Sequence, residues 1–206
     1  ISMIASFLIL IISTFFLYNE KISKSKVYYY INQFISLGYS IPGAVVALAV
    51  IISVNSLDNL DDNIRLLGSF SVYFLILIYA YIIRFMAVGK SPIKSSMEKY
   101  PYSYNNSAKN LGLSNFKIFQ KVYFPINKYA FFTALTLVFV DIMKELPITL
   151  ILRPFNFDTL ATQTYEFAIE EMIPLYTIYS SVIIIICCIL LIFLKMFLDK
   201  SNVYRN

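Results

Sequence analysis

The 206-residue sequence contains no histidine and no tryptophan, and it has only two cysteines. Without histidine there is no His-based proton relay, no Ser-His or Cys-His nucleophile pair and no His metal ligand. Cys187 and Cys188 are neighbours in an apolar run. Because adjacent residues of a helix point in different directions, a disulfide between them would be strained. We therefore expect two buried, free thiols.

Charged residues are also scarce, at 14% of the chain, while 59% of the residues are hydrophobic. A soluble domain is nearer a quarter charged, so this balance indicates a membrane protein. Ile1 lies inside an apolar run without a starting Met or a basic n-region, so we expect a fragment of a longer chain and no signal peptide. Five segments are apolar enough to cross about 30 Å of hydrocarbon. They are residues 1–18, 39–57, 66–88, 128–147 and 176–198.

The charges between these segments alternate in sign. Segments 19–38 and 84–128 and the C-terminal tail are basic, whereas 58–65 and 148–175 are rich in Asp and Glu. Because cytoplasmic loops carry an excess of Lys and Arg, the pattern places the basic segments and the C-terminus in the cytoplasm and the acidic loops outside. The net charge of +5 then reflects membrane topology, and we expect no nucleic-acid partner.

The basic segment 89–127 is too long for a structureless loop, and apolar residues recur in it at helical spacing. One series is Tyr104, Ala108 and Leu111, and the second is Phe116, Phe119 and Val122. Gly112 between the two series favours a helix–turn–helix hairpin. Its apolar edge suits a groove on a partner protein, and the same pattern suits a hairpin that lies on anionic lipid. The residues alone leave both interpretations open.

Residues 106–125 read N-S-A-x-x-x-G, nine residues, then V-x-F-P. This resembles the coupling motif E-A-A-x-x-x-G, nine residues, I-x-L-P of binding-protein-dependent ABC importer permeases. The motif positions are Asn106, Ser107, Ala108, Gly112, Val122 and Pro125, with Asn106 in place of the usual Glu. LGYSIPGAVVALAV (37–50), YAYIIRFMAVG (79–89) and KELPITLILRPFNFDTLATQTYE (144–166) are similar to the iron(III)-type branch of these permeases. Together the similar stretches are spread over most of the chain, from residue 37 to residue 166.

The resemblance implies an all-α polytopic bundle, with residues 1–206 as a single transmembrane permease domain and 89–127 as its cytoplasmic coupling loop. The motif residues, with Phe116 and Phe119, would contact cytoplasmic ABC ATPase subunits. Further implied partners are a periplasmic or extracellular substrate-binding protein, a second permease half or subunit, and the bilayer of a bacterial-type inner membrane. The chain would be no enzyme and would bind no cofactor, because the ATPase uses the ATP. Iron(III) is the leading cargo, with thiamine or a phosphonate as alternatives.

Ionisable residues and prolines in the apolar segments are candidates for the translocation path or gate. A charge there is costly unless it is paired or faces water. Asp141 and Lys144 are three residues apart and can pair on one helix face, so a self-satisfied local ion pair is the alternative. Pro42 suits a hinge, and it also simply fits the first turn of a helix. The candidates are Pro42, Gly43, Asp141, Lys144, Glu145, Pro147, Thr149 and Arg153.

Two other classes of membrane protein are alternatives to an importer permease. A secondary transporter would use Asp141, Lys144 and Glu145 as an ion-coupled relay and would work without ATP. A membrane-embedded enzyme fits less well, because there is no histidine and no recognisable intramembrane Ser or Asp motif. The substring VGKS (88–91) is not a phosphate-binding loop, because Arg84 stands where that motif needs Gly. An ATPase must therefore be another chain.

Overall fold

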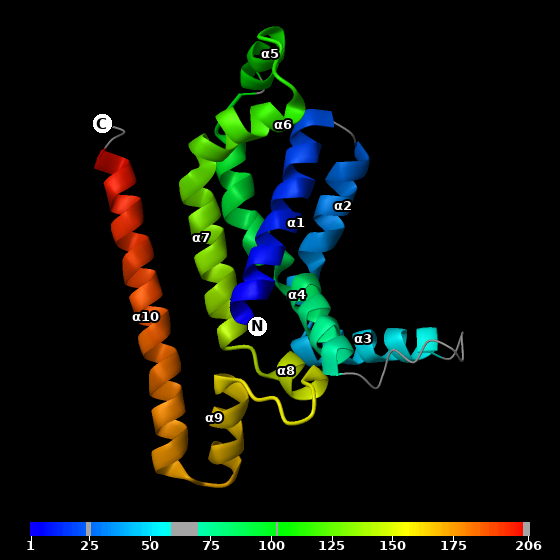
Figure 1. The fold of residues 1–206 in the computed structure, drawn as a ribbon, viewed down its shortest axis with the longest axis vertical. Coiled ribbons are helices and arrows are strands. Elements are labelled where there is room, and N and C mark those ends of the chain that lie inside the picture. The colour runs from blue at the N-terminus through cyan, green and yellow to red at the C-terminus, as the bar shows by residue number, and fades with distance from the viewer. Residues whose placement is uncertain (24–25, 59–69, 102, 204–206) are drawn as a thin grey trace.

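The computed structural model describes residues 1–23, 26–58, 70–101 and 103–203, and every regular element within these ranges is helical. Figure 1 shows an elongated bundle with a small helical hairpin at one end, which we call the hairpin end. The elements are α1 (Ser2–Ser23), α2 (Lys26–Ser36), the 3₁₀-helix η1 (Leu37–Ser40), α3 (Gly43–Asp58), α4 (Phe70–Glu98), α5 (Ser103–Asn110), α6 (Asn115–Ile118), the π-helical turn η2 (Phe119–Tyr123), α7 (Phe124–Met143), α8 (Pro147–Leu152), α9 (Leu160–Ile169) and α10 (Ile173–Val203).

Three long helices, α1, α4 and α7, form the core of the bundle, and each packs against the other two. Small residues lie at their contacts, because Ala5 of α1, Ala80 of α4 and Ala134 of α7 are all fully buried. Small side chains let helices approach closely, which increases the dispersion contacts that hold helices together in lipid. Larger side chains such as Ile9 and Tyr81 fill the space between the helices.

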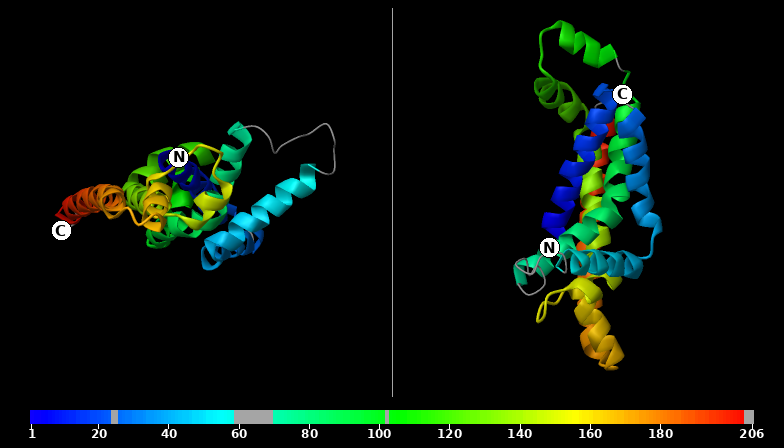
Figure 2. Two further views of the ribbon diagram at one scale, coloured as in Figure 1. Left: turned by 90° about the horizontal axis from the view of Figure 1, so that it is seen from below. Right: turned by 90° about the vertical axis from the view of Figure 1, so that its right-hand side faces the viewer.

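The direction of the helices agrees with an odd number of membrane crossings. Figures 1 and 2 show α1, α4 and α10 running towards the hairpin end, whereas α2 and α7 run away from it. Four helices are each long and apolar enough to cross a membrane, and α2 with η1 and α3 meets the same test as a bent pair. If that pair counts once, the described chain has five crossings, as the sequence predicts.

The position of the second predicted segment, 39–57, is wrong. The chain runs along the bundle as α2 and η1, bends by 115° and continues as α3, which lies across the end opposite the hairpin. Pro42 has no N–H and holds Ile41 in an extended conformation (φ −85°, ψ 133°), so the helix cannot continue. The polar residues of α2 lower its hydropathy, and for this reason the sequence suggests a cytoplasmic loop at 19–38. In the fold α2 packs against α1 and α4.

The boundaries of the third and fourth segments also differ from the prediction. α4 continues to Glu98, although the sequence analysis assigns 89–98 to the cytoplasmic loop. α6 and η2 lead without interruption into α7, so Asn115–Met143 is one apolar unit. Pro147 does not end this helix; α7 stops at Met143, and Pro147 begins α8, because proline fits the first turn of a helix.

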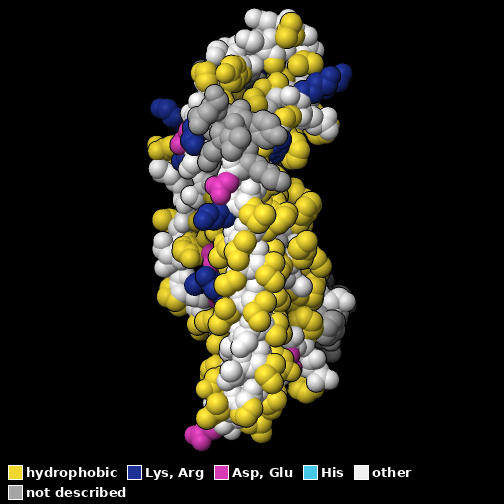
Figure 3. Space-filling model, turned by 90° about the vertical axis from the view of Figure 1, so that its left-hand side faces the viewer, with side chains coloured by type: hydrophobic (Ala, Val, Ile, Leu, Met, Phe, Trp, Pro, Cys, Tyr) yellow, Lys and Arg dark blue, Asp and Glu magenta, His cyan; other side chains and the backbone are white. Residues whose placement is uncertain are grey.

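Helix α10 stands apart from the core. It packs along α7 and α9, but only 6% of its apolar window is buried. Figure 3, viewed from that side, shows hydrophobic side chains over most of this face, with Lys and Arg towards the hairpin end or along one edge. Such a long apolar surface suits hydrocarbon. The thiols of Cys187 and Cys188 on α10 are free, as predicted, but Cys188 is exposed and Cys187 half-buried, so the expected burial is wrong.

Some of the predicted charge pattern lies outside the described residues. This part comprises Lys24, most of the acidic segment 58–65 and Arg205. The other basic residues of the predicted cytoplasmic segments are spread along the bundle. Those of α5, α6 and η2, among them Lys117, lie at the hairpin end, whereas Arg84 lies halfway along α4 and contacts the opposite end of the bundle.

Candidate functional site

Two helix breaks lie against the same stretch of α4. One is the bend between η1 and α3, and the other is the break between α7 and α8. Arg84 of α4 connects them, because its Nε is 3.6 Å from Oε2 of Glu145 and its Nη1 donates a hydrogen bond of 2.5 Å to the carbonyl of Ile41. We call Ile41, Gly43, Arg84 and Glu145 the clasp.

Glu145 is the buried anion of the clasp, with 8% of its surface exposed. A buried carboxylate is stable only when it is paired and hydrogen-bonded. Arg84 supplies the opposite charge, and the backbone N–H of Ile148 in the first turn of α8 donates to Oε1 of Glu145 at 3.3 Å. The ion pair therefore fastens the start of α8 to α4.

Gly43 lets the backbone approach this ion pair. A Cβ at this position would lie 2.6 Å from Oε1 of Glu145 and 3.4 Å from Cζ of Arg84. The first distance is shorter than any ordinary contact, so a larger residue would displace the carboxylate or the helix. Pro42 breaks the helix, and Gly43 then allows α3 to pass directly beside the clasp.

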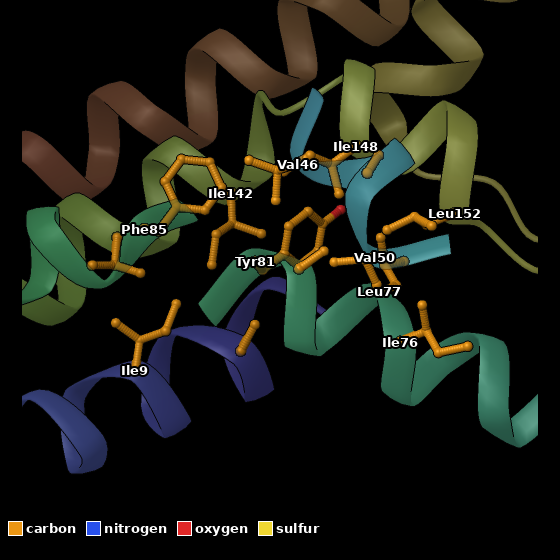
Figure 4. Close-up of a cluster of buried hydrophobic side chains, with 14 residues drawn as sticks. Ile9, Val46, Val50, Ile76, Leu77, Tyr81, Phe85, Ile142, Ile148 and Leu152 are labelled. Carbon is orange, nitrogen blue, oxygen red and sulfur yellow. The ribbon is translucent and has the colours of Figure 1, made fainter. Parts of the chain in front are cut away.

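A second buried polar contact lies next to the clasp. The hydroxyl of Thr149 donates to the carbonyl of Glu145 at 2.8 Å, and it lies 2.6 Å from the hydroxyl of Tyr81. Figure 4 shows the Tyr81 ring inside an apolar cluster that includes Val46 and Ile148. Satisfied polar groups in an apolar surrounding fix one arrangement, because unpaired ones would be costly. Tyr81 and Thr149 thus hold α8 against α4.

The predicted pairing of Asp141 with Lys144 is present, but it does not join the clasp. Nζ of Lys144 lies 2.8 Å from Oδ1 of Asp141, and the Lys144 side chain is mostly exposed. This hydrogen bond to Asp141 raises the pKa of Lys144 above its ordinary value. Lys144 and Glu145 lie in the break after α7 and pair with different partners. The three ionisable residues therefore do not form one continuous relay.

Arg153 follows α8 and braces the loop that leads to α9. Its guanidinium forms ion pairs with Asp158 and with Glu166, the latter at 2.5 Å. Between Arg153 and Asp158 the chain turns at Asn156, which has a positive φ of 63°. Phe155 projects from the loop with 97% of its surface exposed. Arg153 thus shapes a loop at the end opposite the hairpin and does not contact the clasp residues.

The predicted coupling residues divide into a buried and an exposed group. Ala108 packs with Ile118 and Tyr123 in a small core, and Phe119 and Val122 are half-buried against it. These side chains hold the hairpin together and are not presented to a partner. The exposed group consists of Asn106, Ser107, Gly112, Phe116 and Pro125.

The turn between α5 and α6 is the most exposed part of the hairpin. Gly112 has a φ of +77°, which favours glycine, and no atom lies within 4 Å of the place where its Cβ would be. Leu111 on one side is 80% exposed, and Phe116 on the other side is 68% exposed. Figure 2 shows this hairpin projecting beyond the long helices. The geometry therefore presents apolar side chains away from the bundle.

Sequence reasoning missed three residues with buried polar contacts. Arg84 and Lys90 were both assigned to the basic cytoplasmic segment, and Tyr81 was given no part. In the fold Lys90 is 5% exposed and donates to the backbone carbonyl of Asn32 on α2. The sequence does carry a signal for Arg84, because this residue lies inside an apolar run. A charge inside the membrane needs a partner of opposite charge. Glu145, which lies in another apolar run, is such a residue.

Within the part of the chain that the structure describes, no three His, Cys, Asp or Glu side chains gather as a metal site would require. The two ends of the bundle differ in the kind of side chain that they expose. At one end apolar side chains are exposed on a hairpin, and at the other end a buried ion pair joins two helix breaks. One apolar helical unit, Asn115–Met143, connects the two ends.

Residues 21–202 match the family described as "Binding-protein-dependent transport system inner membrane component". The chain is also 24% identical over 172 residues to the Fe(3+)-transport system permease protein FbpB 2 of Haemophilus influenzae, and the match covers 83% of this chain and 32% of that protein. It thus spans about a third of the length of this curated relative. With the family matched over most of its length and with apolar helices long enough to cross a membrane, the chain belongs to the inner membrane components of binding-protein-dependent transport systems.

Proposed function

We propose that this chain is the permease part of an ATP-driven importer, in which a separate cytoplasmic ATPase binds the hairpin of α5 and α6. The observation that carries the proposal is the exposure of Leu111 and Phe116 on a hairpin that continues directly into α7. A projecting surface with large apolar side chains marks an interaction site. Transport in this family depends on a binding protein, which supports the wider arrangement.

The hairpin end faces the cytoplasm in this proposal, and so does the C-terminus. The exposed surface of the hairpin carries Lys109, Lys117 and Lys121. Cytoplasmic loops of membrane proteins have such an excess of positive charge. The clasp and the Arg153 loop then lie at the outer end of the bundle, where the binding protein docks. A second permease half completes the path, and it belongs either to the same polypeptide or to another subunit.

The coupling passes along one continuous helical stretch. When the ATPase closes on ATP, it moves the hairpin, and Asn115–Met143 carries the movement to the break that holds Glu145. Glu145 then moves away from Arg84, and the contact between α8 and α4 loosens. Because separated charges are tolerated only where they face water, the clasp opens onto an aqueous path and not onto lipid.

Iron(III) is the cargo that we propose. Its support is the resemblance to iron(III)-type permeases together with the similarity to a permease whose name specifies Fe(3+) transport. The permease passes the ion on and needs no resident metal site for this step. Uptake of labelled ferric ion into proteoliposomes that contain the complete transporter tests the cargo. Equal or better uptake of thiamine or a phosphonate would replace iron(III) with that alternative.

The ATPase interaction is tested by co-purification of the complete polypeptide with its ATPase. Phe116→Asp places a charge on the exposed hairpin surface, and we expect it to lose most of the ATPase. Phe155→Asp is the matched control, because Phe155 is also an exposed phenylalanine but lies on the loop between α8 and α9 at the opposite end. Retention of the ATPase by the control alone supports the proposal. Equal retention by both variants and the native protein would contradict it.

A further inference from the structure

The hairpin-end turn of α1 contacts both sides of the polar segment that carries the hairpin. Nζ of Lys21 donates hydrogen bonds to the carbonyls of Met97 (2.7 Å) and Tyr100 (2.8 Å). The Met97 carbonyl lies in the last turn of α4, whose final carbonyl groups lack partners within the helix, and the Tyr100 carbonyl lies two residues beyond that helix. A lysine that binds them caps the helix. Lys21 thereby fixes the point at which the chain leaves α4 for the hairpin.

Tyr18, three residues before Lys21 and therefore on the same side of α1, contacts the returning side of the hairpin. Its hydroxyl donates a hydrogen bond of 2.5 Å to the carbonyl of Asn115, the first residue of α6. Its ring packs edge-on against Phe119 and Tyr123, with centroids 5.1 and 5.3 Å apart. Tyr18 thus joins α1 to the small core of the hairpin.

The same turn of α1 is anchored in the bundle. Leu17 is buried beside Ile93 and Met97 of α4 and beside Phe131 of α7. A displacement of the hairpin therefore acts on α1 directly, through three hydrogen bonds to backbone carbonyls and a ring cluster, as well as on α7 through the continuous helix. The acceptors of these hydrogen bonds are backbone carbonyls. A movement of the helix backbone therefore changes the donor–acceptor distances directly.

We propose that Tyr18 and Lys21 form a tether that makes α1 move together with the coupling hairpin. They are positioning residues for transport, and they do not contact the ATPase. This inference rests on the proposed function, because it assigns a second route for the movement that ATP drives. Without the tether, the hairpin can hold the ATPase and still move without displacing α1 relative to α4.

The test uses the complete polypeptide with its ATPase and binding protein in lipid nanodiscs. Tyr18→Phe keeps the ring and removes the hydroxyl, Lys21→Met keeps the side-chain length and removes the donor, and both are combined. Tyr30→Phe and Lys26→Met, at exposed positions of α2, are the matched controls. We expect the double variant to retain the ATPase at the native level, while stimulation of ATP hydrolysis by loaded binding protein falls about tenfold or more.

Hydrogen–deuterium exchange separates this inference from the proposed function. Loss of the tether should speed amide exchange over 99–118 about tenfold or more, with or without ATPase, because exchange reports local opening. Unchanged exchange would overturn the tether even if no ATPase binds. Faster exchange with native stimulation would show a merely structural contact and would overturn it as well. Loss of the ATPase by the double variant but not by the controls would also overturn it, whereas a native protein that never holds an ATPase would contradict the proposed function.

Discussion

The hairpin end and the clasp end of the bundle place apolar and charged side chains in opposite ways. At the hairpin end, Leu111 and Phe116 are exposed while lysines surround them. At the clasp end, Arg84 and Glu145 are largely buried while Phe155 projects outward on a loop. Exposed apolar side chains are available to a partner, whereas buried charges are held by their mutual contact. In the function that we propose, docking belongs to the first end and conformational control to the second.

The two glycines of these sites show the same contrast. Gly43 is surrounded so closely that a Cβ would strike the Glu145 carboxylate, whereas a Cβ on Gly112 would meet nothing. Gly43 is needed for space, and Gly112 is needed for its positive φ. Substitutions at the two ends should therefore differ in size and in the property that they change.

Removal of the Glu145 carboxylate should have the largest effect. Glu145→Ala leaves Arg84 buried without its partner, and breaking a buried ion pair costs about 3–5 kcal/mol. We expect the free energy of unfolding in nanodiscs, measured with denaturant, to fall by about that amount. The double variant Arg84→Met/Glu145→Met should recover much of the loss, because no unpaired charge remains. A loss for Glu145→Ala no larger than for Asp141→Ala would contradict the clasp.

Gly43→Ala should have the next largest effect. The added methyl group would lie 2.6 Å from Oε1 of Glu145, so the carboxylate or α3 must move. Overpacking of this kind costs about 1–3 kcal/mol. Thermal unfolding of the variant should show the loss, and the added loss should shrink in a Glu145→Ala background, because the carboxylate that the methyl group would meet is then absent. A fully native unfolding profile for Gly43→Ala would show that α3 does not pass beside the clasp.

Gly112→Ala should change ATPase binding more than stability. A positive φ costs a non-glycine residue about 1–2 kcal/mol, and the position is otherwise open. We expect the turn to shift, and the affinity for the ATPase to weaken about tenfold, since that energy corresponds to such a factor. Titration of labelled ATPase against the nanodisc protein measures this. Unfolding of the bundle should stay close to native, and a large stability loss would place the turn inside the core.

Asp141→Asn should have the smallest effect. It removes the charge that pairs with the mostly exposed Lys144, and such pairs contribute about 0–1 kcal/mol. Ferric uptake and thermal unfolding should both remain near native. A loss of uptake comparable with that of Glu145→Ala, in a native protein whose uptake needs an ion gradient and no ATP, would instead support the ion-coupled relay of a secondary transporter.

The long apolar helices were predictable from the sequence, because about 20 apolar residues in a row leave few alternatives. The hairpin was also predictable, since two helical patterns flank Gly112. Helix α2 was not, because its polar residues conceal a segment that packs inside the bundle. The prolines were recognised as breaks, but a sequence does not show whether Pro147 ends one helix or begins the next.

Long-range pairings were the least predictable part of the site. Asp141 and Lys144 pair as their spacing indicates, because local geometry decides that contact. Arg84 and Glu145 are far apart in the sequence, and their contact depends on both helix breaks. The same holds for Lys21, whose acceptors are backbone carbonyls that leave no signal in the residue types. Spacing therefore predicts contacts within one helix, and packing decides the rest.

The most direct test of the central claim, that docking at the hairpin opens the clasp, is the labelling rate of a buried thiol. Val46→Cys, in a background of Cys187→Ser and Cys188→Ser, places a thiol at a buried position of α3 in the cluster beside the clasp. We expect a soluble maleimide to react slowly in the resting protein and about tenfold faster or more with ATPase, ATP and loaded binding protein. Phe116→Asp should remove this acceleration. A labelling rate that does not change with ATP would contradict the account.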